Sequence, residues 1–209
     1  MKTIFITGAS SGIGQALAHA YAKRYQHKGV SIGLVARRSE HLQQLSAELT
    51  KQYQTKCYLY VCDVRNATAL NTAAQDFIQQ VGAPNIVIAN AGVSRGTLTE
   101  YQEDIAAFQA VMDINVMGMV HTFQPFIDAM KHARAQGAQA QLVGVASVAG
   151  IRGLPGAGAY SASKAAAITY LESLRTEMQH HDIAVTTIAP GYIRTPMTAI
   201  NTYAMPFLM

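Results

Sequence analysis

The segment Thr7–Gly14, TGASSGIG, carries the strongest structural signal of the chain, because it follows a short apolar run, Thr3–Thr7, and leads directly into helical spacing. We expect Gly8 to form a tight turn, Gly12 to let the backbone approach a phosphate, and Gly14 to let the helix pack close to the strand. The first helical turn would then offer free N–H groups and a positive dipole end to that phosphate. Glycines after a strand can also form an ordinary turn, and G-x-x-x-G-x-G is not the commoner G-x-G-x-x-G. The strand–turn–helix context favours a dinucleotide site.

Outward from this turn, short apolar runs alternate with segments of helical periodicity. The expected strands are Thr3–Thr7, Val30–Ala36, Lys56–Val61, Ile86–Ala89, Gln141–Ala146 and Ile183–Ala189. The expected helices are Ile13–Tyr25, Ser39 to about Lys51, Asn66–Val81, a long helical region Glu100–Arg134 kinked near Pro125, and Tyr160–Gln179. Such alternation requires right-handed crossovers and gives a parallel sheet covered on both faces. The sequence therefore predicts a doubly wound, Rossmann-like α/β fold with strand order 3-2-1-4-5-6 and its ligand beyond the carboxyl ends of the strands.

Length and composition indicate one folded unit, which we expect to span residues 1–209 as a single domain. Half of the residues are hydrophobic and 13% are charged, which excludes a disordered chain and a coiled coil. No apolar run approaches the ~18 residues of a membrane span, and the opening apolar run is too short for a signal peptide. Two cysteines cannot form a disulfide scaffold. These features favour a cytoplasmic protein.

The formal net charge of +4 is unevenly distributed. Residues 1–39 hold six basic and no acidic side chains, whereas the remainder holds ten basic and twelve acidic ones. A nucleic-acid-binding protein usually shows a basic stripe with aromatic residues or a recognition helix, and this chain shows neither. Its seven histidines have no metal-ligand spacing. We therefore expect no nucleic acid, no membrane and no metal among its partners.

Further motifs follow the glycine-rich turn in a fixed order. They are Asp63-Val64 after the third strand, Asn90-Ala91-Gly92 after the fourth, Asn115 in the long helical region, Ser147 after the fifth strand, Tyr160-Ser161-Ala162-Ser163-Lys164, and Pro190-Gly191 after the sixth. With the turn, these motifs resemble the short-chain dehydrogenase/reductase family from residue 3 to about residue 197. The resemblance implies a nicotinamide coenzyme and hydride transfer to or from a small-molecule carbonyl or alcohol.

The end of the second strand indicates which coenzyme binds. In dinucleotide folds an acidic residue there bonds the ribose 2′-hydroxyl of NAD, whereas an arginine accommodates the 2′-phosphate of NADP. This chain reads Val35-Ala36-Arg37-Arg38, without a carboxylate. We expect NADP, with Arg37 as the main phosphate contact and Arg38 as an auxiliary one, because a guanidinium matches phosphate oxygens. The alternative is that both are solvated surface charges.

The resemblance implies the rest of the coenzyme site. Asp63 would accept a hydrogen bond from the adenine amino group, and Val64 would pack near that ring. Asn90 would line the adenosine ribose, although a purely structural turn residue is the alternative there. The full expected set is Gly8, Ser10, Ser11, Gly12, Ile13, Gly14, Arg37, Arg38, Asp63, Val64, Asn90, Ala91, Gly92, Tyr160, Lys164, Pro190, Gly191, Ile193 and Thr195, the last two at the nicotinamide carboxamide.

Tyr160 and Lys164 are four residues apart on an expected helix and so share one face. A free tyrosine titrates near 10, whereas an efficient acid/base titrates closer to 7. Lowering the pKa of the tyrosine by ~3 units requires on the order of 4 kcal/mol of preferential stabilisation of the phenolate. An ammonium and the positive ring of the oxidised coenzyme would supply it. The resemblance implies Tyr160 as acid/base, Lys164 on the ribose, Ser147 donating to the substrate oxygen, and Asn115 holding a water that joins Lys164 to solvent. Competing interpretations are a core tyrosine beside a surface lysine, and a buried asparagine that satisfies a kinked helix.

These features predict an NADP-dependent carbonyl reductase or alcohol dehydrogenase. A catalytically idle NADP(H)-sensing or scaffold protein is the alternative, because a fold alone implies no activity. The resemblance also implies a homodimer or homotetramer formed by the helices after Asn115 and Tyr160. Family members continue with a substrate-covering helix and a seventh strand, so we expect a C-terminal segment to be missing and residues 192–209 to be part of a substrate lid.

Overall fold

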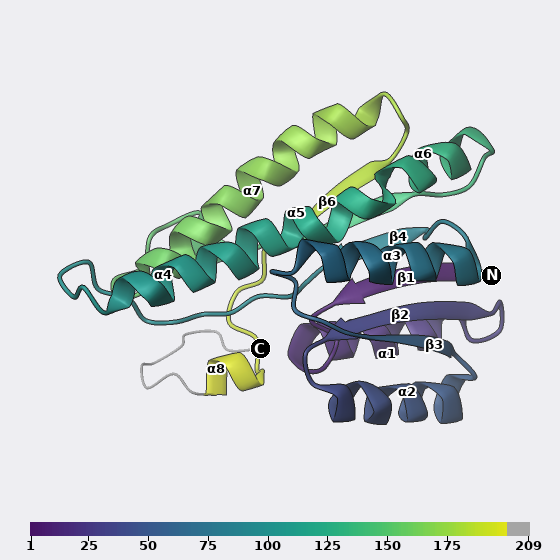
Figure 1. Ribbon diagram of the computed structural model, residues 1–209, viewed down its shortest axis with the longest axis horizontal. Helices are drawn as coiled ribbons and strands as arrows, with labels where there is room; N and C mark the ends of the chain where they lie inside the picture. The colour runs from purple at the N-terminus through teal and green to yellow at the C-terminus, as the bar shows by residue number, and fades with distance from the viewer. Residues whose placement is uncertain (200–209) are drawn as a thin grey trace.

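A computed structural model describes residues 1–199, and within them the chain forms a six-stranded sheet of order β3-β2-β1-β4-β5-β6 (Figure 1). Each neighbouring pair of strands is parallel. The strands are β1 (Lys2–Thr7), β2 (Val30–Ala36), β3 (Lys56–Val61), β4 (Ile86–Ala89), β5 (Gln141–Val145) and β6 (Ala184–Ile188). The predicted fold class and strand order are confirmed. The order reverses between β1 and β4, where a doubly wound sheet opens a crevice for a ligand.

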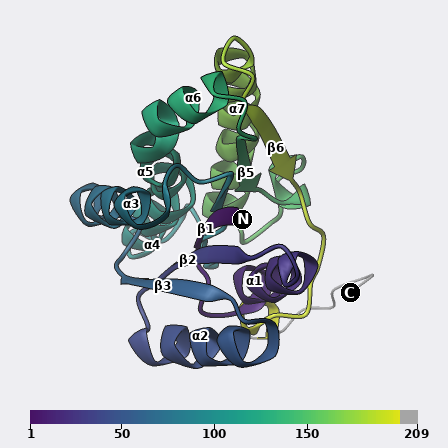
Figure 2. The same cartoon turned by 90° about the vertical axis from the view of Figure 1, so that its right-hand side faces the viewer.

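Helices cover both faces of the sheet (Figure 2). One face packs against α1 (Gly12–Tyr25) and α2 (Ser39–Tyr53), and the other packs against α3, α5, α6 and α7. The remaining bounds are α3 (Ala67–Val81), α4 (Asp104–Met112), α5 (Gly118–Phe123), α6 (Ile127–Ala135), α7 (Gly158–Gln179) and α8 (Pro196–Ala199). Among the described residues, no helix is long and apolar enough to cross a membrane.

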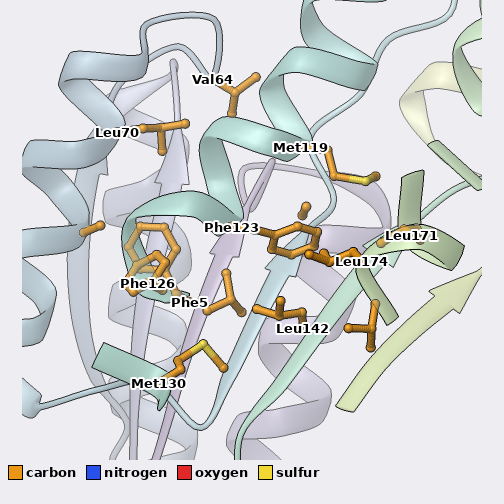
Figure 3. Close-up of a cluster of buried hydrophobic side chains, with 14 of the residues drawn as sticks. Phe5, Val64, Leu70, Met119, Phe123, Phe126, Met130, Leu142, Leu171 and Leu174 are labelled. Carbon is orange, nitrogen blue, oxygen red and sulfur yellow. The ribbon is translucent and has the colours of Figure 1, made fainter. Parts of the chain in front are cut away.

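Strand β1 shows why the apolar residues of a central strand need not alternate with polar ones. Ile4 and Ile6 point into the core beside α1 and α2, whereas Phe5 points into the opposite core. There the ring centroid of Phe5 lies 5.4 Å from that of Phe77. It lies 4.7 Å from that of Phe126 (Figure 3). Because neither face of the strand meets water, its sequence is a continuous apolar run rather than an alternating one.

The long helical region differs from the prediction in its details. It begins at Asp104 rather than Glu100, and the predicted kink at Pro125 is a short 3₁₀ turn between α5 and α6. Proline has no N–H to donate, which explains this break. A five-residue π-helical turn, Asp113–Met117, also separates α4 from α5. The sequence did not predict this turn, which carries Asn115.

Helix α7 begins at Gly158, not at Tyr160 as predicted. The backbone N–H of Ala159 donates to the hydroxyl of Thr97 at 3.2 Å, so a residue far away in the chain satisfies the first turn. The expected lid 192–209 is described as far as residue 199, where α8 ends. Its other part, 200–209, lies outside the described residues.

Candidate active site

The predicted site residues meet at the carboxyl ends of the strands. A cavity of about 280 Å³ lies there, between the turns that follow β1, β2, β3, β4 and β5 and the segment after β6. All predicted site residues except Gly14 and Asn115 line it. Residues that the sequence did not single out also line it; they are Val35, Ala36, Cys62, Val93, Ile114, Val145, Ala146, Pro196, Met197 and Thr198. Most of these are direct neighbours of predicted residues, which is the signal that would have found them.

The glycine-rich turn has the geometry that its sequence predicts. Gly8 and Gly12 have φ values of +69° and +57°, a region that favours glycine. A Cβ on Gly8 would lie 2.8 Å from the Cα of Ala91, and one on Gly14 would collide with the carbonyl oxygen of Gly8. Gly14 is buried behind the cavity, so its hydrogen side chain serves close packing.

The start of α1 fits a phosphate group. Ser11 is the N-cap residue, and its side chain makes no capping hydrogen bond. The first N–H groups of a helix have no partner within the helix. Ser11, Gly12 and Ile13 all line the cavity, so these donors lie at its wall and suit an anion.

Asn90 joins the two central strands at the same edge. Its Nδ2 donates to the carbonyl oxygens of Thr7 at 3.0 Å and Gly8 at 3.2 Å. Its backbone N–H donates to the hydroxyl of Thr7 at 3.2 Å. Asn90 therefore has the structural role kept as an alternative, and it also lines the cavity where the resemblance implies a ribose.

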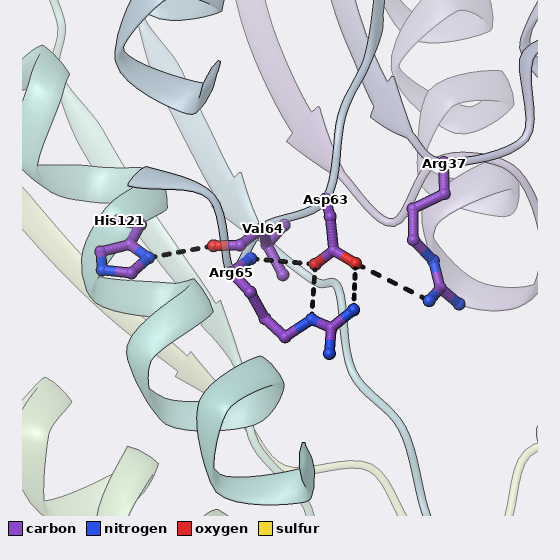
Figure 4. Close-up of polar contacts among 5 residues, drawn as sticks. All are labelled: Arg37, Asp63, Val64, Arg65 and His121. Carbon is purple, nitrogen blue, oxygen red and sulfur yellow. Dashed lines mark hydrogen bonds and ion pairs between the residues drawn. The ribbon is translucent and has the colours of Figure 1, made fainter. Parts of the chain in front are cut away.

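Arginines gather around one carboxylate at the far end of the cavity (Figure 4). Asp63 accepts hydrogen bonds from Nε and Nη2 of Arg65 at 3.1 and 2.8 Å, and from the backbone N–H of Arg65 at 3.0 Å. Nη1 of Arg37 lies 3.7 Å from Oδ2 of Asp63. Hydrogen bonding by Arg65 holds the pKa of the Asp63 carboxyl below its usual value. Arg65 was not among the predicted site residues, because it forms no part of a motif.

Arg38 points to the glycine-rich turn instead. Its Nη2 donates to the hydroxyls of Ser10 and Ser11, both at 3.0 Å. A guanidinium thus lies beside the glycine-rich turn, while Arg37 lies beside Asp63. The two adjacent arginines occupy different places along the wall of the cavity.

The loop after β3 is anchored to α5. The Nδ1 atom of His121 lies 3.0 Å from the carbonyl oxygen of Val64 (Figure 4). A carbonyl oxygen can only accept, so Nδ1 carries the hydrogen. The Val64 side chain packs on Gly118, where a Cβ would lie 2.7 Å from Cγ2 of Val64. Asp63 therefore extends from a fixed loop.

Lys164 is buried at the opposite end of the cavity, with 4% of its surface exposed. Its Nζ donates to the carbonyl oxygen of Val145 at 2.8 Å and lies 5.8 Å from the centroid of the Tyr160 ring. Burial lowers the pKa of the Lys164 ammonium to about 8. The Oγ of Ser147 accepts a hydrogen bond from the N–H of Ala149 at 3.2 Å, which leaves its O–H to act as a donor.

Asn115 lies behind the cavity and is almost fully buried. Its Oδ1 accepts from the N–H of Val93 at 2.8 Å, and its Nδ2 donates to the carbonyl oxygen of Val93 and to the hydroxyl of Ser163, both at 2.9 Å. The side chain thus ties the loop after β4 to α7. The side chain is buried, as the alternative interpretation expects, but the backbone groups that it bonds belong to Val93 in the loop and not to the kinked helix.

A second cavity of about 300 Å³ adjoins the first and shares Ser147 and Tyr160 with it. Its described lining is Ser94, Ser147, Val148, Ala149, Arg152, Leu154, Tyr160, Gly191, Tyr192, Met197 and Thr198. Arg152 is the one charged residue in this lining. The hydroxyl-bearing residues Ser147 and Tyr160 therefore lie where a ligand in one cavity would meet a ligand in the other. No group of metal-binding side chains occurs within residues 1–199.

Comparison with known proteins gives a consistent result. The family model described as short chain dehydrogenase matches residues 2–204. An uncharacterized oxidoreductase from Myxococcus xanthus is 36% identical over 208 residues, which cover 100% of this chain and 78% of that protein. An 11-beta-hydroxysteroid dehydrogenase-like protein from Arabidopsis thaliana is 36% identical over 198 residues, which cover 94% of this chain and 61% of that protein.

Solved structures of similar proteins superimpose on the fold of this chain. An alcohol dehydrogenase from Thermococcus sibiricus, complexed with 5-hydroxy-NADP, superimposes with a TM-score of 0.82 at 27% identity, covering 92% of this chain and 77% of that one. Levodione reductase superimposes with a TM-score of 0.83 at 28% identity, covering 94% of this chain and 73% of that one.

Proposed function

The chain belongs to the short-chain dehydrogenase/reductase family, a family of oxidoreductases that use NAD(P)(H), and on this premise we propose that it is an NADP(H)-dependent enzyme that interconverts a carbonyl compound and an alcohol. The observation that carries the proposal is the position of Tyr160 and Ser147 at the junction of the two cavities, with Lys164 behind Tyr160. The first cavity would hold the coenzyme, and the second would hold the substrate.

NADPH bound in the first cavity would supply the hydride. Hydride transfer leaves negative charge on the carbonyl oxygen, so a proton must reach that oxygen as the hydride arrives. We assign Tyr160 as the proton donor in reduction and as the proton acceptor in alcohol oxidation. Ser147 would donate its O–H to the same oxygen and so orient the substrate.

Lys164 would support Tyr160 electrostatically, because a nearby ammonium favours the phenolate form of a tyrosine. It would also bond the ribose next to the nicotinamide. Asn115 has its amide engaged with Val93 and Ser163, so its contribution would be to fix the loop after β4 beside Lys164. A water held in this region would then have to use the backbone around Asn115 rather than its Nδ2.

Two features support NADP(H) over NAD(H). The turn after β2 presents Arg37 and Arg38 to the cavity, and it has no carboxylate of the kind that bonds the 2′-hydroxyl of NAD. Arg38 is held by Ser10 and Ser11 at the phosphate-binding turn. The Arg37 side chain is 64% exposed, and its 3.7 Å contact with Asp63 is an ion pair rather than a hydrogen bond. Arg37 can therefore turn to a phosphate without breaking a hydrogen bond to Asp63.

The proposal is tested by measuring whether the protein oxidises NADPH in the presence of each compound of a carbonyl panel. The panel should contain ketones, sugars, steroids and carrier-bound 3-oxoacyl chains, each ketone beside a carboxylated analogue because Arg152 lines the substrate cavity. Oxidation of NADPH in preference to NADH with at least one class is the expected result. Tight NADPH binding without turnover on any compound would favour the alternative, an idle NADP(H)-sensing or scaffold protein.

We also propose that copies of the chain associate as a homodimer or homotetramer through the helices after Asn115 and Tyr160, which are α5 and α7. Helix α4, which precedes Asn115 and packs against α7, would add to this interface. Helix α4 exposes Ile105 over 66% and Phe108 over 41% of their surfaces, which is unusual for apolar side chains left in water. Light scattering of wild type and of Ile105→Glu tests this. A monomeric wild type would overturn the proposal.

A further inference from the structure

We propose that Arg65 sets the coenzyme preference without contacting the coenzyme, by hydrogen-bonding and neutralising the Asp63 carboxylate so that Arg37 keeps only a long ion pair with it. This inference rests on the proposed function, because it takes the first cavity as the site of NADP(H). It assigns a positioning role to a residue that belongs to no motif of the chain.

The positions of Asp63 and Arg37 follow from the sheet. Strands β2 and β3 pair in parallel, Ala36 opposite Val61, and the N–H of Cys62 donates to the carbonyl oxygen of Ala36 at 3.2 Å. Arg37 directly follows Ala36, and Asp63 directly follows Cys62. The fold therefore places a negative charge close to the arginine that we assign to the 2′-phosphate.

An unneutralised carboxylate at this place would act against NADP(H) in two ways. It would repel the phosphate, since like charges in proximity oppose binding. It would also attract Arg37, whose Nη1 already lies 3.7 Å from Oδ2 of Asp63, and so compete with the phosphate for the same guanidinium. Both effects require the charge of Asp63, and both fall on the 2′-phosphate rather than on the rest of the coenzyme.

Arg65 counters both effects through its contacts with Asp63. Its Nε bonds one carboxylate oxygen and its Nη2 bonds the other, at 3.1 and 2.8 Å, a bidentate arrangement that is stronger than a single contact. The backbone N–H of Arg65 adds a third bond to Oδ1 at 3.0 Å. Arg37 forms an ion pair with the same carboxylate, but at 3.7 Å it is beyond hydrogen-bonding distance. The carboxylate is thus satisfied by Arg65, and Arg37 keeps its donors for another anion.

The neighbouring residues fix the backbone around Arg65. On one side Val64 is held by His121, and on the other side Asn66 caps α3 by accepting a hydrogen bond from the N–H of Ala69 at 3.0 Å. Asp63, Arg37 and Arg38 line the coenzyme cavity, whereas Arg65 does not belong to its described lining. The proposed effect of Arg65 on the coenzyme therefore passes through Asp63.

Two probes that differ only in the 2′-phosphate test this proposal, namely adenosine 2′,5′-bisphosphate and 5′-AMP. Their dissociation constants are measured by titration calorimetry for wild type, Arg65→Gln, Asp63→Asn and the double variant. Lys56→Gln, at the other end of β3, is the control for the loss of one positive charge. We expect Arg65→Gln to weaken binding of the bisphosphate by about tenfold, which is 1.4 kcal/mol, and to change binding of 5′-AMP little. The control Lys56→Gln should change the binding of either probe little.

The double variant separates action through Asp63 from direct contact with the phosphate. Once Asp63→Asn has removed the charge, Arg65→Gln should no longer change the ratio of the two dissociation constants. Arg65→Lys, which keeps the charge but not the bidentate geometry, should restore part of the ratio. A melting curve of each variant shows that it is folded.

The possible results are distinct. Equal weakening of both probes by Arg65→Gln would mean a merely structural role and would overturn the inference, as would an undiminished effect in the Asp63→Asn background. If wild type does not prefer the bisphosphate over 5′-AMP, the proposed NADP(H) preference is wrong and the inference fails with it. If wild type prefers the bisphosphate but Arg65→Gln leaves the ratio unchanged, the proposed function stands and only the inference is lost.

Discussion

The ammonium of Lys164 donates a hydrogen bond to the carbonyl oxygen of Val145 at 2.8 Å, which links the first half of α7 to the end of β5. Gly92, in the loop after β4, also lies close to the ammonium, where a Cβ would be 3.5 Å from Nζ. A buried charge is therefore held beside the end of β5, on the helix that also carries Tyr160.

Burial of this charge predicts a pH-dependent stability. The pKa of Lys164 falls from 10.5 to about 8, which corresponds to roughly 3 kcal/mol. Below about pH 8 the amine is charged in the folded and the unfolded chain, so the folded state bears the full cost of burial. Between about pH 8 and 10.5 only the unfolded chain holds the proton, so stability rises with pH. Urea unfolding should show this rise in wild type relative to Lys164→Met. A difference between the two proteins that is constant with pH would contradict it.

Replacement of the phenol tests the assignment of the proton donor. Tyr160→Phe removes one hydroxyl and keeps the ring, so NADPH should bind with little change. Turnover on the best carbonyl substrate should fall by about 10²–10⁴-fold, the usual contribution of a positioned acid. Steady-state rates and a fluorescence titration with NADPH measure the two quantities separately. Turnover equal to that of wild type would refute the mechanism.

The proposed phosphate contact predicts a coenzyme-specific loss. A charge-assisted hydrogen bond is worth roughly 1.5–3 kcal/mol, so Arg37→Ala should weaken NADPH binding by about 10–100-fold. NADH binding should hardly change, because NADH lacks the 2′-phosphate. Arg95→Ala is a suitable control, since Arg95 is exposed and outside the described lining of either cavity. Equal losses for both coenzymes would argue against the assignment.

The tight packing of the glycine-rich turn predicts a loss of stability. A methyl group at Gly14 would collide with the carbonyl oxygen of Gly8, and backbone cannot move aside as a flexible side chain can. Gly14→Ala should lower the free energy of unfolding by about 1–3 kcal/mol. At Gly153 a Cβ would meet nothing within 4 Å, so Gly153→Ala should have almost no effect. Similar unfolding curves for the two variants would show that α1 can shift away from the turn.

The sequence by itself determined the sheet and most of the candidate site. Strand bounds follow closely from apolar runs that alternate with helical segments, because the central strands are covered on both faces. The strand order was expected from the Rossmann-like fold class. The glycine-rich turn, Ser147 and Lys164 each lie at a strand end or on one helix face, so local spacing is enough to bring them to the same edge of the sheet.

Only the tertiary structure decided how distant residues use their hydrogen-bonding groups. Thr97 starts α7, Asn115 binds Val93 and Ser163 from a π-helical turn, and Arg65 satisfies Asp63. The first two of these pairings join residues far apart in the chain, and the third depends on a loop whose shape is fixed by α5. The physical reason is that apolar periodicity records which face of an element is buried, whereas the partner of a polar group is settled only when separate elements meet.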